Sequence, residues 1–283
     1  MPEEQIIVQL NPDVPPTGSD LGIVNAARKS FGRRSEWETY YETSDYEEYA
    51  KYRLKDKDKR LLEFLARGMT ADDFDGFIEK VQEEAYDELV SNWYDTQRHD
   101  LIDTLWQWRN TPTHDTPFNH GFFSFEIKAP IFVRAQLVKH EYLIMSEYSR
   151  RYITDDVEFY TPTVWREQSS DKKQGSSGEH PLWNHGKGTG YRGREYSHNE
   201  NALGLYKEMI EMGVSIEQAR MVLPQSLMTS WTWSGTLGAF AKMCQLRLAK
   251  DSQYETRLVA KEVYKHLCNQ FPVAAPLLVE GVK

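Results

Sequence analysis

The alternation of apolar and polar residues predicts a strand followed directly by a helix near the middle of the chain. Residues 118–128 alternate, with Phe123, Phe125 and Ile127 on one face. Pro130 follows, and it suits the first turn of a helix because its fixed φ is already helical. A strand that runs straight into a helix is a common framework for a pocket, so this part of the chain is a candidate site.

The residues that follow, 131–152, place many ionic and hydrogen-bonding side chains among apolar ones. If this segment is mostly helical, Gln136, His140, Glu147 and Arg151 are spaced by four, seven and four residues and share one stripe. A polar stripe within an apolar helix costs several kcal/mol unless its members bind one another or a ligand. A solvated surface helix is the ordinary alternative, but the preceding strand favours a binding pocket.

The N-terminal part predicts a strand at residues 5–10 and a short helix at 21–31. Residues 35–109 are charged and mainly helical in pattern, and they predict a helical insertion. Its apolar positions include Leu61, Leu62, Phe64, Leu65, Val81, Ala85, Leu89 and Trp93.

Residues 163–200 differ from both flanks because serine and glycine recur among charges, which predicts a long glycine-rich loop. Long loops in compact enzymes are often mobile lids over a site. His180 and His185 have no spacing typical of metal ligands, so we predict no metal site.

The C-terminal part predicts a helix at 201–212 that Gly213 ends, and a further helix that begins with a capping box of Ser215 and Gln218. A β-compatible segment at 229–232 precedes two helices at 236–248 and 252–271. We therefore expect an α/β protein of the α+β type, helix-rich, with a central and mainly antiparallel sheet, a helical insertion and a long glycine-rich loop. Residues 1–283 are expected to form one domain enlarged by the insertions at 35–109 and 163–200.

Composition narrows the class of protein. No apolar run approaches the roughly 18 residues needed to span a bilayer, and the N-terminus lacks the basic and apolar regions of a signal peptide. We therefore expect a cytoplasmic protein that does not bind membranes. The two cysteines, Cys244 and Cys268, suggest buried thiols rather than a disulfide, a zinc site or nucleophiles.

The formal charge of −9 argues against a nucleic acid polymer as partner, because such binding depends on broad basic surfaces. A mononucleotide is still compatible with this charge. One phosphate group needs only two or three arginines in a local cluster.

Residues 139–152 resemble the signature of the flavin-dependent thymidylate synthases, Arg-His-Arg-x-x-Ser-x-Asn-Glu-x-Ser-x-Arg-Tyr. The matching positions are His140, Glu147, Ser149, Arg151 and Tyr152. Further segments resemble the family in the same order along the chain. They are residues 116–120, 129–133, Gln136, 159–162, 219–224, 246–247 and 252–255.

The resemblance implies that dUMP is bound by Gln136, Glu147, Ser149, Arg151, Arg220 and Arg247. Arginines supply paired donors for a phosphate, and one beside a pyrimidine carbonyl can stabilise charge that develops on the ring. By the same resemblance Arg247 and His120 are candidate catalytic residues. Structural explanations exist for single residues: His120 could be a strand residue, Arg220 and Arg247 could interact with helix C-termini, and Tyr152 could belong to the core.

The flavin side of the signature has changed. The resemblance implies that FAD contacts Lys139, His140, Glu141, Glu147 and Lys242, but the two signature arginines are replaced by Lys139 and Glu141. Ile144 and Ser146 replace the signature serine and asparagine. An anion in place of a cation near a pyrophosphate reverses an interaction of about 4 kcal/mol at 4 Å and an effective dielectric of about 20. FAD would then be held differently, for example by Lys139, Arg134 or Arg150, or held poorly.

The resemblance implies reductive methylation of dUMP at C5, with methylenetetrahydrofolate as carbon donor, NADPH as reductant, FAD as carrier and no enzyme nucleophile. It also implies a homotetramer with active sites shared between subunits. Two alternatives stay open: folate-dependent C5 hydroxymethylation of a pyrimidine deoxynucleotide on the same scaffold, and a non-catalytic nucleotide-binding homologue. The sequence does not distinguish dUMP from dCMP, because one arginine can face the carbonyl of either ring.

Overall fold

The computed structural model describes residues 5–44, 47–66, 114–170, 175–180 and 191–279. The chain divides into two compact units. The first combines Met1–Thr17 with Phe122–His266, and the second combines Gly18–Gly121 with Leu267–Gly281. The expectation of one domain over the whole chain stays a prediction.

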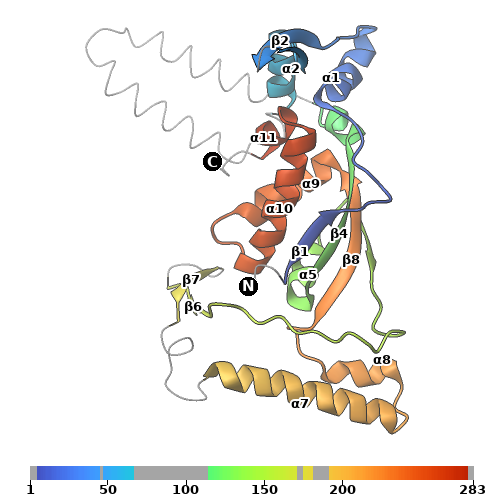
Figure 1. Ribbon diagram of the computed structural model, residues 1–283, viewed down its shortest axis with the longest axis vertical. Coiled ribbons are helices and arrows are strands. Elements are labelled where there is room, and N and C mark those ends of the chain that lie inside the picture. The colour runs from blue at the N-terminus through green and yellow to red at the C-terminus, as the bar shows by residue number, and fades with distance from the viewer. Residues whose placement is uncertain (1–4, 45–46, 67–113, 171–174, 181–190, 280–283) are drawn as a thin grey trace, which may run out of the picture. The chain divides into compact units, whose positions relative to one another are not determined.

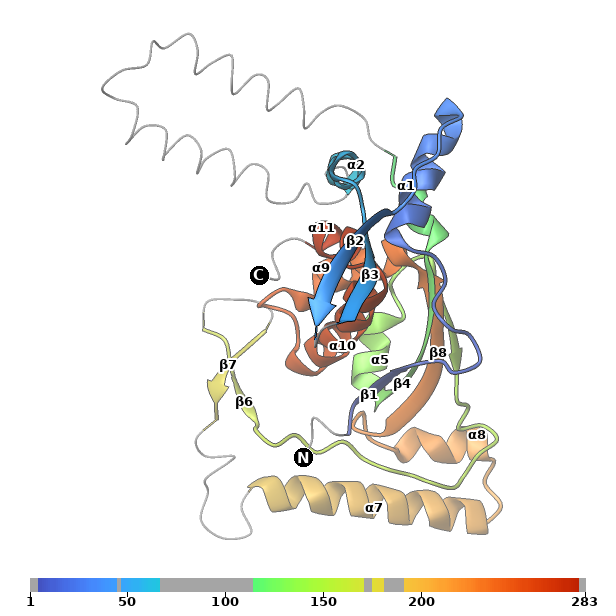
Figure 2. The same ribbon diagram turned by 45° about the horizontal axis from the view of Figure 1, so that its top comes forward.

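A four-stranded antiparallel sheet forms the centre of the first unit. Its strands are β1 (Ile7–Leu10), β4 (Phe122–Pro130), β5 (Leu143–Glu147) and β8 (Met228–Thr236). Their order is β1-β4-β8-β5, and each neighbouring pair is antiparallel, so the expected fold class is confirmed (Figures 1 and 2).

One face of this sheet packs against two helices and forms the core. The predicted inward residues Phe123, Phe125 and Ile127 are buried. Phe240 of α9 (Leu237–Leu248) meets Phe125 edge to face, with 5.0 Å between ring centroids. His266 of α10 (Tyr254–Gln270) lies 5.8 Å from the same ring. Aromatic contacts of this kind add about 0.5–1.5 kcal/mol each to the burial of apolar area.

The prediction of one polar helical stripe across residues 131–152 is wrong. Helix α5 covers Ile131–Leu137 only, and Pro130 is the last residue of β4 as well as the N-cap of α5. A turn with Tyr142 at φ 64° then leads into β5, which pairs with β8 from Leu143↔Gly235 to Glu147↔Trp231. The pairing with β8 is a tertiary interaction that helical periodicity could not reveal.

The glycine-rich segment contains more regular structure than a loop. Strands β6 (Arg166–Gln168) and β7 (Ser176–Glu179) form a small antiparallel pair, and α7 (Tyr191–Glu211) begins ten residues earlier than expected. Gly213 follows α7 with φ 85°, which confirms its predicted role at the helix end. Ser215 precedes α8 (Ile216–Ala219), but its side chain makes no capping hydrogen bond. The turn η5 (Arg220–Val222) follows α8, and the predicted strand at 229–232 lies within β8.

The second unit contains short helices and a β-hairpin. Its helical elements are α1 (Asp20–Arg28), η2 (Lys29–Phe31), α2 (Asp56–Ala66), η4 (Thr116–His120) and α11 (Ala274–Leu278). The hairpin pairs β2 (Glu38–Ser44) with β3 (Glu47–Arg53). The start of the expected helical insertion is therefore wrong, because its tyrosine- and threonine-rich segment pairs as strands. Val81, Ala85, Leu89 and Trp93 lie outside the described residues.

Two buried carboxylates connect elements of the second unit. Asp20 accepts hydrogen bonds from the backbone N–H groups of Val273 (3.0 Å) and Ala274 (2.9 Å) at the start of α11. Asp58 accepts hydrogen bonds from Arg28 Nη2 at 2.5 Å and from Ser35 Oγ. The three helices α1, α2 and α11 are held by these contacts. In the part of the chain that the structure describes, no helix has the length and apolar character needed to cross a membrane.

Candidate functional site

Four of the residues predicted to bind a nucleotide line one cavity of about 540 Å³ in the first unit. Glu147 is the last residue of β5, Ser149 and Arg151 follow it, and Arg220 begins η5. The strand and the short turn therefore bring together residues about 70 positions apart. The cavity is also lined by Ile131, Tyr148, Arg150, Met221, Leu223, Gln225, Leu227 and Thr229.

The two exposed arginines of this cavity are positioned by local contacts. Arg151 Nε donates to Ser149 Oγ at 3.3 Å, and its guanidinium lies 5.1 Å from the ring centroid of Tyr152. Arg220 Nε donates to the carbonyl of Glu217 at 3.3 Å. That bond matches the alternative expectation that Arg220 interacts with a helix C-terminus. It uses one donor of a guanidinium that has five, so the arginine can still bind an anion. Tyr152 is 72% exposed, so it is not a core residue.

Glu147 and Arg150, which also line the cavity, make structural contacts within the protein. Glu147 pairs with Arg134 Nη2 at 2.5 Å and accepts from Thr229 Oγ1 at 3.1 Å. Arg150 is buried and donates to the carbonyls of Asp155 and Asp156. Arg134 and Arg150 are the alternative flavin contacts that the sequence suggests. Their guanidinium groups already bind the protein itself.

Gln136 and Arg247 do not line this cavity within one chain. The Gln136 amide donates to Gln253 Oε1 and accepts from Thr256 Oγ1 at 3.1 Å. Arg247, in the last turn of α9, donates through Nε to His140 Nε2 at 2.9 Å. The structure therefore brings together four of the six predicted nucleotide residues and places the other two elsewhere in the same unit.

The bond between Arg247 and His140 requires a neutral imidazole, because a protonated Nε2 cannot accept. Burial lowers the pKa of His140, and the neighbouring Arg247 charge lowers it further, to about 4. The imidazole is therefore an acceptor at neutral pH. The family resemblance assigns His140 to the flavin and Arg247 to the nucleotide. Here the two side chains are bound to each other.

The remaining predicted residues are dispersed. His120 is exposed at the end of η4 in the second unit, so the alternative that it is a strand residue is wrong. Lys139 and Glu141 are exposed in the turn after α5, and Lys242 is exposed on α9. Lys139 and Lys242 fit the phosphates of FAD by charge, whereas Glu141 opposes them. No cluster of three or more His, Cys, Asp or Glu side chains suited to a metal ion occurs among the described residues, which exclude His185.

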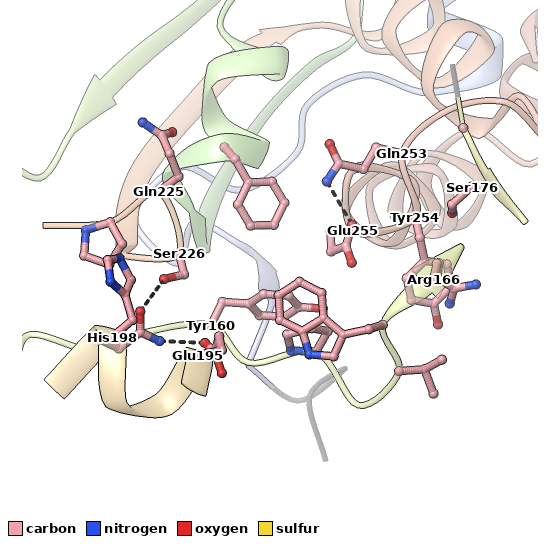
Figure 3. A pocket seen from close by; sticks show the side chains of 17 residues that line it. Tyr160, Arg166, Ser176, Glu195, His198, Gln225, Ser226, Gln253, Tyr254 and Glu255 are labelled. Carbon is pink, nitrogen blue, oxygen red and sulfur yellow. Dashed lines mark hydrogen bonds between the residues drawn. The ribbon is translucent and has the colours of Figure 1, made fainter. Parts of the chain in front are cut away.

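A second cavity of about 650 Å³ lies in the same unit and was not predicted (Figure 3). Its walls come from segments that the sequence singled out for other reasons: residues 159–162 and 252–255 for their family resemblance, and 163–200 as a loop. It is lined by Phe132, Tyr160, Pro162, Val164, Trp165, Arg166, Gly175, Ser176, Glu195, His198, Asn199, Pro224, Gln225, Ser226, Gln253, Tyr254 and Glu255. The sequence signal for this cavity was the density of aromatic residues in these segments, without any indication that they converge.

The chain matches one protein family over most of its length. The model of the thymidylate synthase complementing protein family, Thy1, matches residues 15–273. A flavin-dependent thymidylate synthase of Thermus thermophilus is 36% identical over 174 residues, 62% of this chain and 61% of that protein. The enzyme of the same name from Kosmotoga olearia is 35% identical over 162 residues, 56% of this chain and 68% of the relative. The matched stretch thus spans about three fifths of the Thermus relative.

Solved structures with the same fold include the UMP/dUMP methylase PolB of Streptomyces cacaoi. Its structure bound with 5-Br UMP has a TM-score of 0.63 and 20% sequence identity, and covers 96% of this chain and 92% of that one. Its structure bound with 5-Br dUMP has a TM-score of 0.62 and 22% identity, with 96% and 94% coverage. At this level of identity the likeness supports the fold alone.

Proposed function

Because the chain belongs to the thymidylate synthase complementing protein family, that of the flavin-dependent thymidylate synthases, we propose that it methylates dUMP reductively at C5 to give dTMP. Methylenetetrahydrofolate would donate the carbon, NADPH the reducing equivalents, and FAD would carry the hydride. Cys244 is fully buried, in keeping with a reaction that needs no thiolate nucleophile.

The observation that carries this proposal is that Arg151 and Arg220 line one cavity together with Ser149. Both guanidinium groups are exposed and carry donors for the phosphate oxygens of a mononucleotide. Ser149 adds a hydroxyl. The protein has a formal charge of −9 but places two exposed arginines at this cavity. This local positive charge supports a small anionic ligand there.

We place Gln136 and Arg247 in the same reaction through assembly. A homotetramer with shared sites would let these side chains complete the nucleotide cavity of a neighbouring chain. Strand β5 supports such assembly, because it is an edge strand of the described sheet. Large apolar side chains are exposed around it: Tyr142 is 78% exposed and Ile144 71%. The oligomeric state is tested by measuring the molecular mass of the protein in solution.

The flavin would be held through Lys139 and Lys242, whose ammonium groups can pair with its phosphates. Glu141 weakens that site by charge, so we expect a lower affinity for FAD than a pair of arginines would give. His140 would lie near the flavin, as the family resemblance implies.

The second candidate is folate-dependent C5 hydroxymethylation of dUMP or dCMP. The replacements Glu141, Ile144 and Ser146 at the flavin side of the signature favour it, because hydroxymethylation ends with water instead of hydride and needs no reductive step. A purified protein that is colourless, and whose turnover is independent of NADPH, would support this reaction.

Mass spectrometry of the nucleotide product distinguishes these reactions. The protein is incubated with dUMP, methylenetetrahydrofolate, FAD and NADPH. We expect a methylated product that requires NADPH. A hydroxymethylated product would replace the first proposal by the second. Binding of dUMP without any product, under each reductant tried, would indicate a non-catalytic homologue.

A further inference from the structure

We propose that the second cavity, called here the aromatic cavity and lined by the 17 residues named above, is a separate binding site for a planar nitrogen heterocycle that carries an amino group. An aminopurine or an aminopyrimidine ring belongs to this class. The inference goes beyond the proposed function and does not depend on it, because none of the six predicted nucleotide residues lines this cavity.

The aromatic residues suit a flat ring. Tyr160 is buried and meets Phe132 edge to face, with 6.0 Å between ring centroids. Trp165 and Tyr254 contribute two further rings to the lining. Arg166 stacks over Tyr254 at 3.8 Å from the ring centroid, which fixes that ring and the guanidinium together. A volume of about 650 Å³ is within the usual range for ligand pockets and admits a bicyclic heterocycle.

Glu195 provides the polar specificity. Its Oε1 accepts from Asn199 Nδ2 at 2.6 Å, and Asn199 Oδ1 accepts from Ser226 Oγ at 3.2 Å. Glu195 Oε2 is buried and has no hydrogen-bond partner among the described residues. A buried carboxylate oxygen without a donor is costly, so it favours a ligand that brings an N–H group. Figure 3 shows Glu195 on the wall that also carries Ser226 and His198.

Glu255, on the opposite wall in Figure 3, is already used by the protein. It accepts from Gln253 Nε2 at 3.1 Å and forms a hydrogen bond with the hydroxyl of Tyr160. Burial raises the pKa of Tyr160, and the charge of Glu255 raises it further, so this hydroxyl stays a donor. Of the two carboxylates that line this cavity, Glu195 is thus the one with an oxygen left to accept from the ligand, and a ring that presents a carbonyl to it is repelled.

The aromatic cavity adjoins the nucleotide cavity without being part of it. Gln225 lines both, while the cations Arg151 and Arg220 line the nucleotide cavity alone. An uncharged amino heterocycle would therefore prefer the aromatic cavity, and a phosphate ester the other.

The test uses the full chain and 2-aminopurine, a fluorescent probe whose emission is quenched when it stacks on aromatic side chains. We expect saturable quenching. Unsubstituted purine, which lacks the amino group, should compete about 10- to 100-fold less well, the range for one hydrogen bond to a charged group. Adenosine and pterin serve as two further competitors. Displacement by the first assigns the site to an adenine-bearing ligand, and displacement by the second to a pterin-bearing one.

Glu195→Gln sharpens the test because the Gln carbonyl must take over the bond from Asn199, which turns the amide NH₂ toward the ligand. The variant should lose affinity for 2-aminopurine by about 10- to 100-fold and gain affinity for 2-hydroxypurine. Glu200→Gln, on the same helix but outside the cavity, should bind the probe like the wild type. Trp165→Leu should lower the affinity for both 2-aminopurine and purine. With this second variant, a folding defect in one of them does not decide the outcome.

Three results would overturn the proposal. They are saturable quenching that is unchanged in Glu195→Gln and in Trp165→Leu, the absence of any saturable quenching, and displacement of the probe by dUMP, which would place the probe in the nucleotide cavity.

Discussion

The imidazole of His140 and the guanidinium of Arg247 depend on each other for their protonation and position. Nε2 of His140 must be unprotonated to accept from Arg247 Nε at 2.9 Å. Burial lowers the pKa of His140 first, and the Arg247 charge adds to it, so that the pKa is about 4. Replacing Arg247 by leucine should raise this pKa only part of the way to 6.5, because the burial remains.

NMR titration of the histidine side chains measures this directly. We expect the His140 midpoint near pH 4 in the wild type and a higher one in Arg247→Leu. His266, whose pKa is lowered mainly by its burial against Phe125, is an internal control and should not change. An identical His140 midpoint in both proteins would contradict the contact.

The same pair predicts the direction of pH dependence. Because the folded-state pKa of His140 lies below that of the unfolded chain, the unfolded state binds more protons between about pH 6.5 and 4. The stability that His140 contributes is present above about pH 6.5 and is lost as the pH falls toward about 4. Urea unfolding at about pH 7.5 and at about pH 5.5 measures this loss. The unfolding free energy should fall less between the two pH values in His140→Gln than in the wild type. An equal fall in both proteins would contradict the lowered pKa of His140.

Arg247→Ala tests the proposed catalytic role of Arg247. We expect it to abolish turnover of dUMP and to leave the far-UV circular dichroism unchanged, because Arg247 is partly exposed at the end of α9. Turnover should survive in Arg34→Ala, an exposed arginine of the second unit. Near-normal activity of Arg247→Ala would remove it from the site.

At the scale of elements, the edge strand β5 depends on Gly235 of β8. A Cβ at Gly235 would overlap Leu143 Cδ2 and would lie 3.0 Å from the backbone oxygen of Tyr142. Gly235→Ala should therefore destabilise the protein by about 1–3 kcal/mol. The double variant with Leu143→Ala should recover part of this loss.

Gly204→Ala is the matched control, since nothing lies within 4 Å of a Cβ at Gly204 in the interior of α7. It should stabilise by about 0.5–1 kcal/mol. Denaturant unfolding measures both. Equal stabilities of Gly235→Ala and Gly204→Ala would show that the close approach of β5 to β8 is not required.

In the second unit, α1 and α2 are connected by the fully buried Asp58. Asp58→Ala would leave the guanidinium of Arg28, whose Nε already lacks a partner among the described residues, without its counter-charge. We expect a loss of about 3–5 kcal/mol in unfolding free energy. Asp56→Ala removes an exposed pair with Lys59 and should cost less than about 1 kcal/mol. Similar losses in the two variants would contradict the account.

Elements with a strong local signal were predicted well. The alternation of Phe123, Phe125 and Ile127 identified β4, and the amphipathic pattern before Gly213 identified the second half of α7. Strand β5, after α5, was not predicted because it forms only by pairing with β8. No local pattern shows that Gly235 of β8 leaves the space that this pairing needs. The β2–β3 hairpin was missed because the tyrosines and threonines that favour strands stand among many charged residues.

For the whole molecule, the family resemblance was sufficient to predict Glu147, Ser149 and Arg151 of the signature, together with Arg220 farther along the chain, as one group, and the four line one cavity. The sequence could not show that Gln136 and Arg247 point elsewhere within one chain, because that depends on hydrogen bonds to Thr256, Gln253 and His140. The aromatic cavity was missed for the same reason, since its walls come from segments up to about 120 residues apart. The match to the family spans both units, from residue 15 to 273.

The central claim is that Arg220 and Arg151 bind the phosphate of a deoxyuridine nucleotide. Calorimetric titration of the full chain with dUMP and with deoxyuridine, in the wild type and in Arg220→Ala, tests it most directly. We predict that dUMP binds the wild type much more tightly than deoxyuridine does. Arg220→Ala should weaken dUMP by about 10- to 100-fold and leave deoxyuridine unchanged. Equal affinities for the two ligands in the wild type, or an unchanged dUMP affinity in Arg220→Ala, would contradict the account.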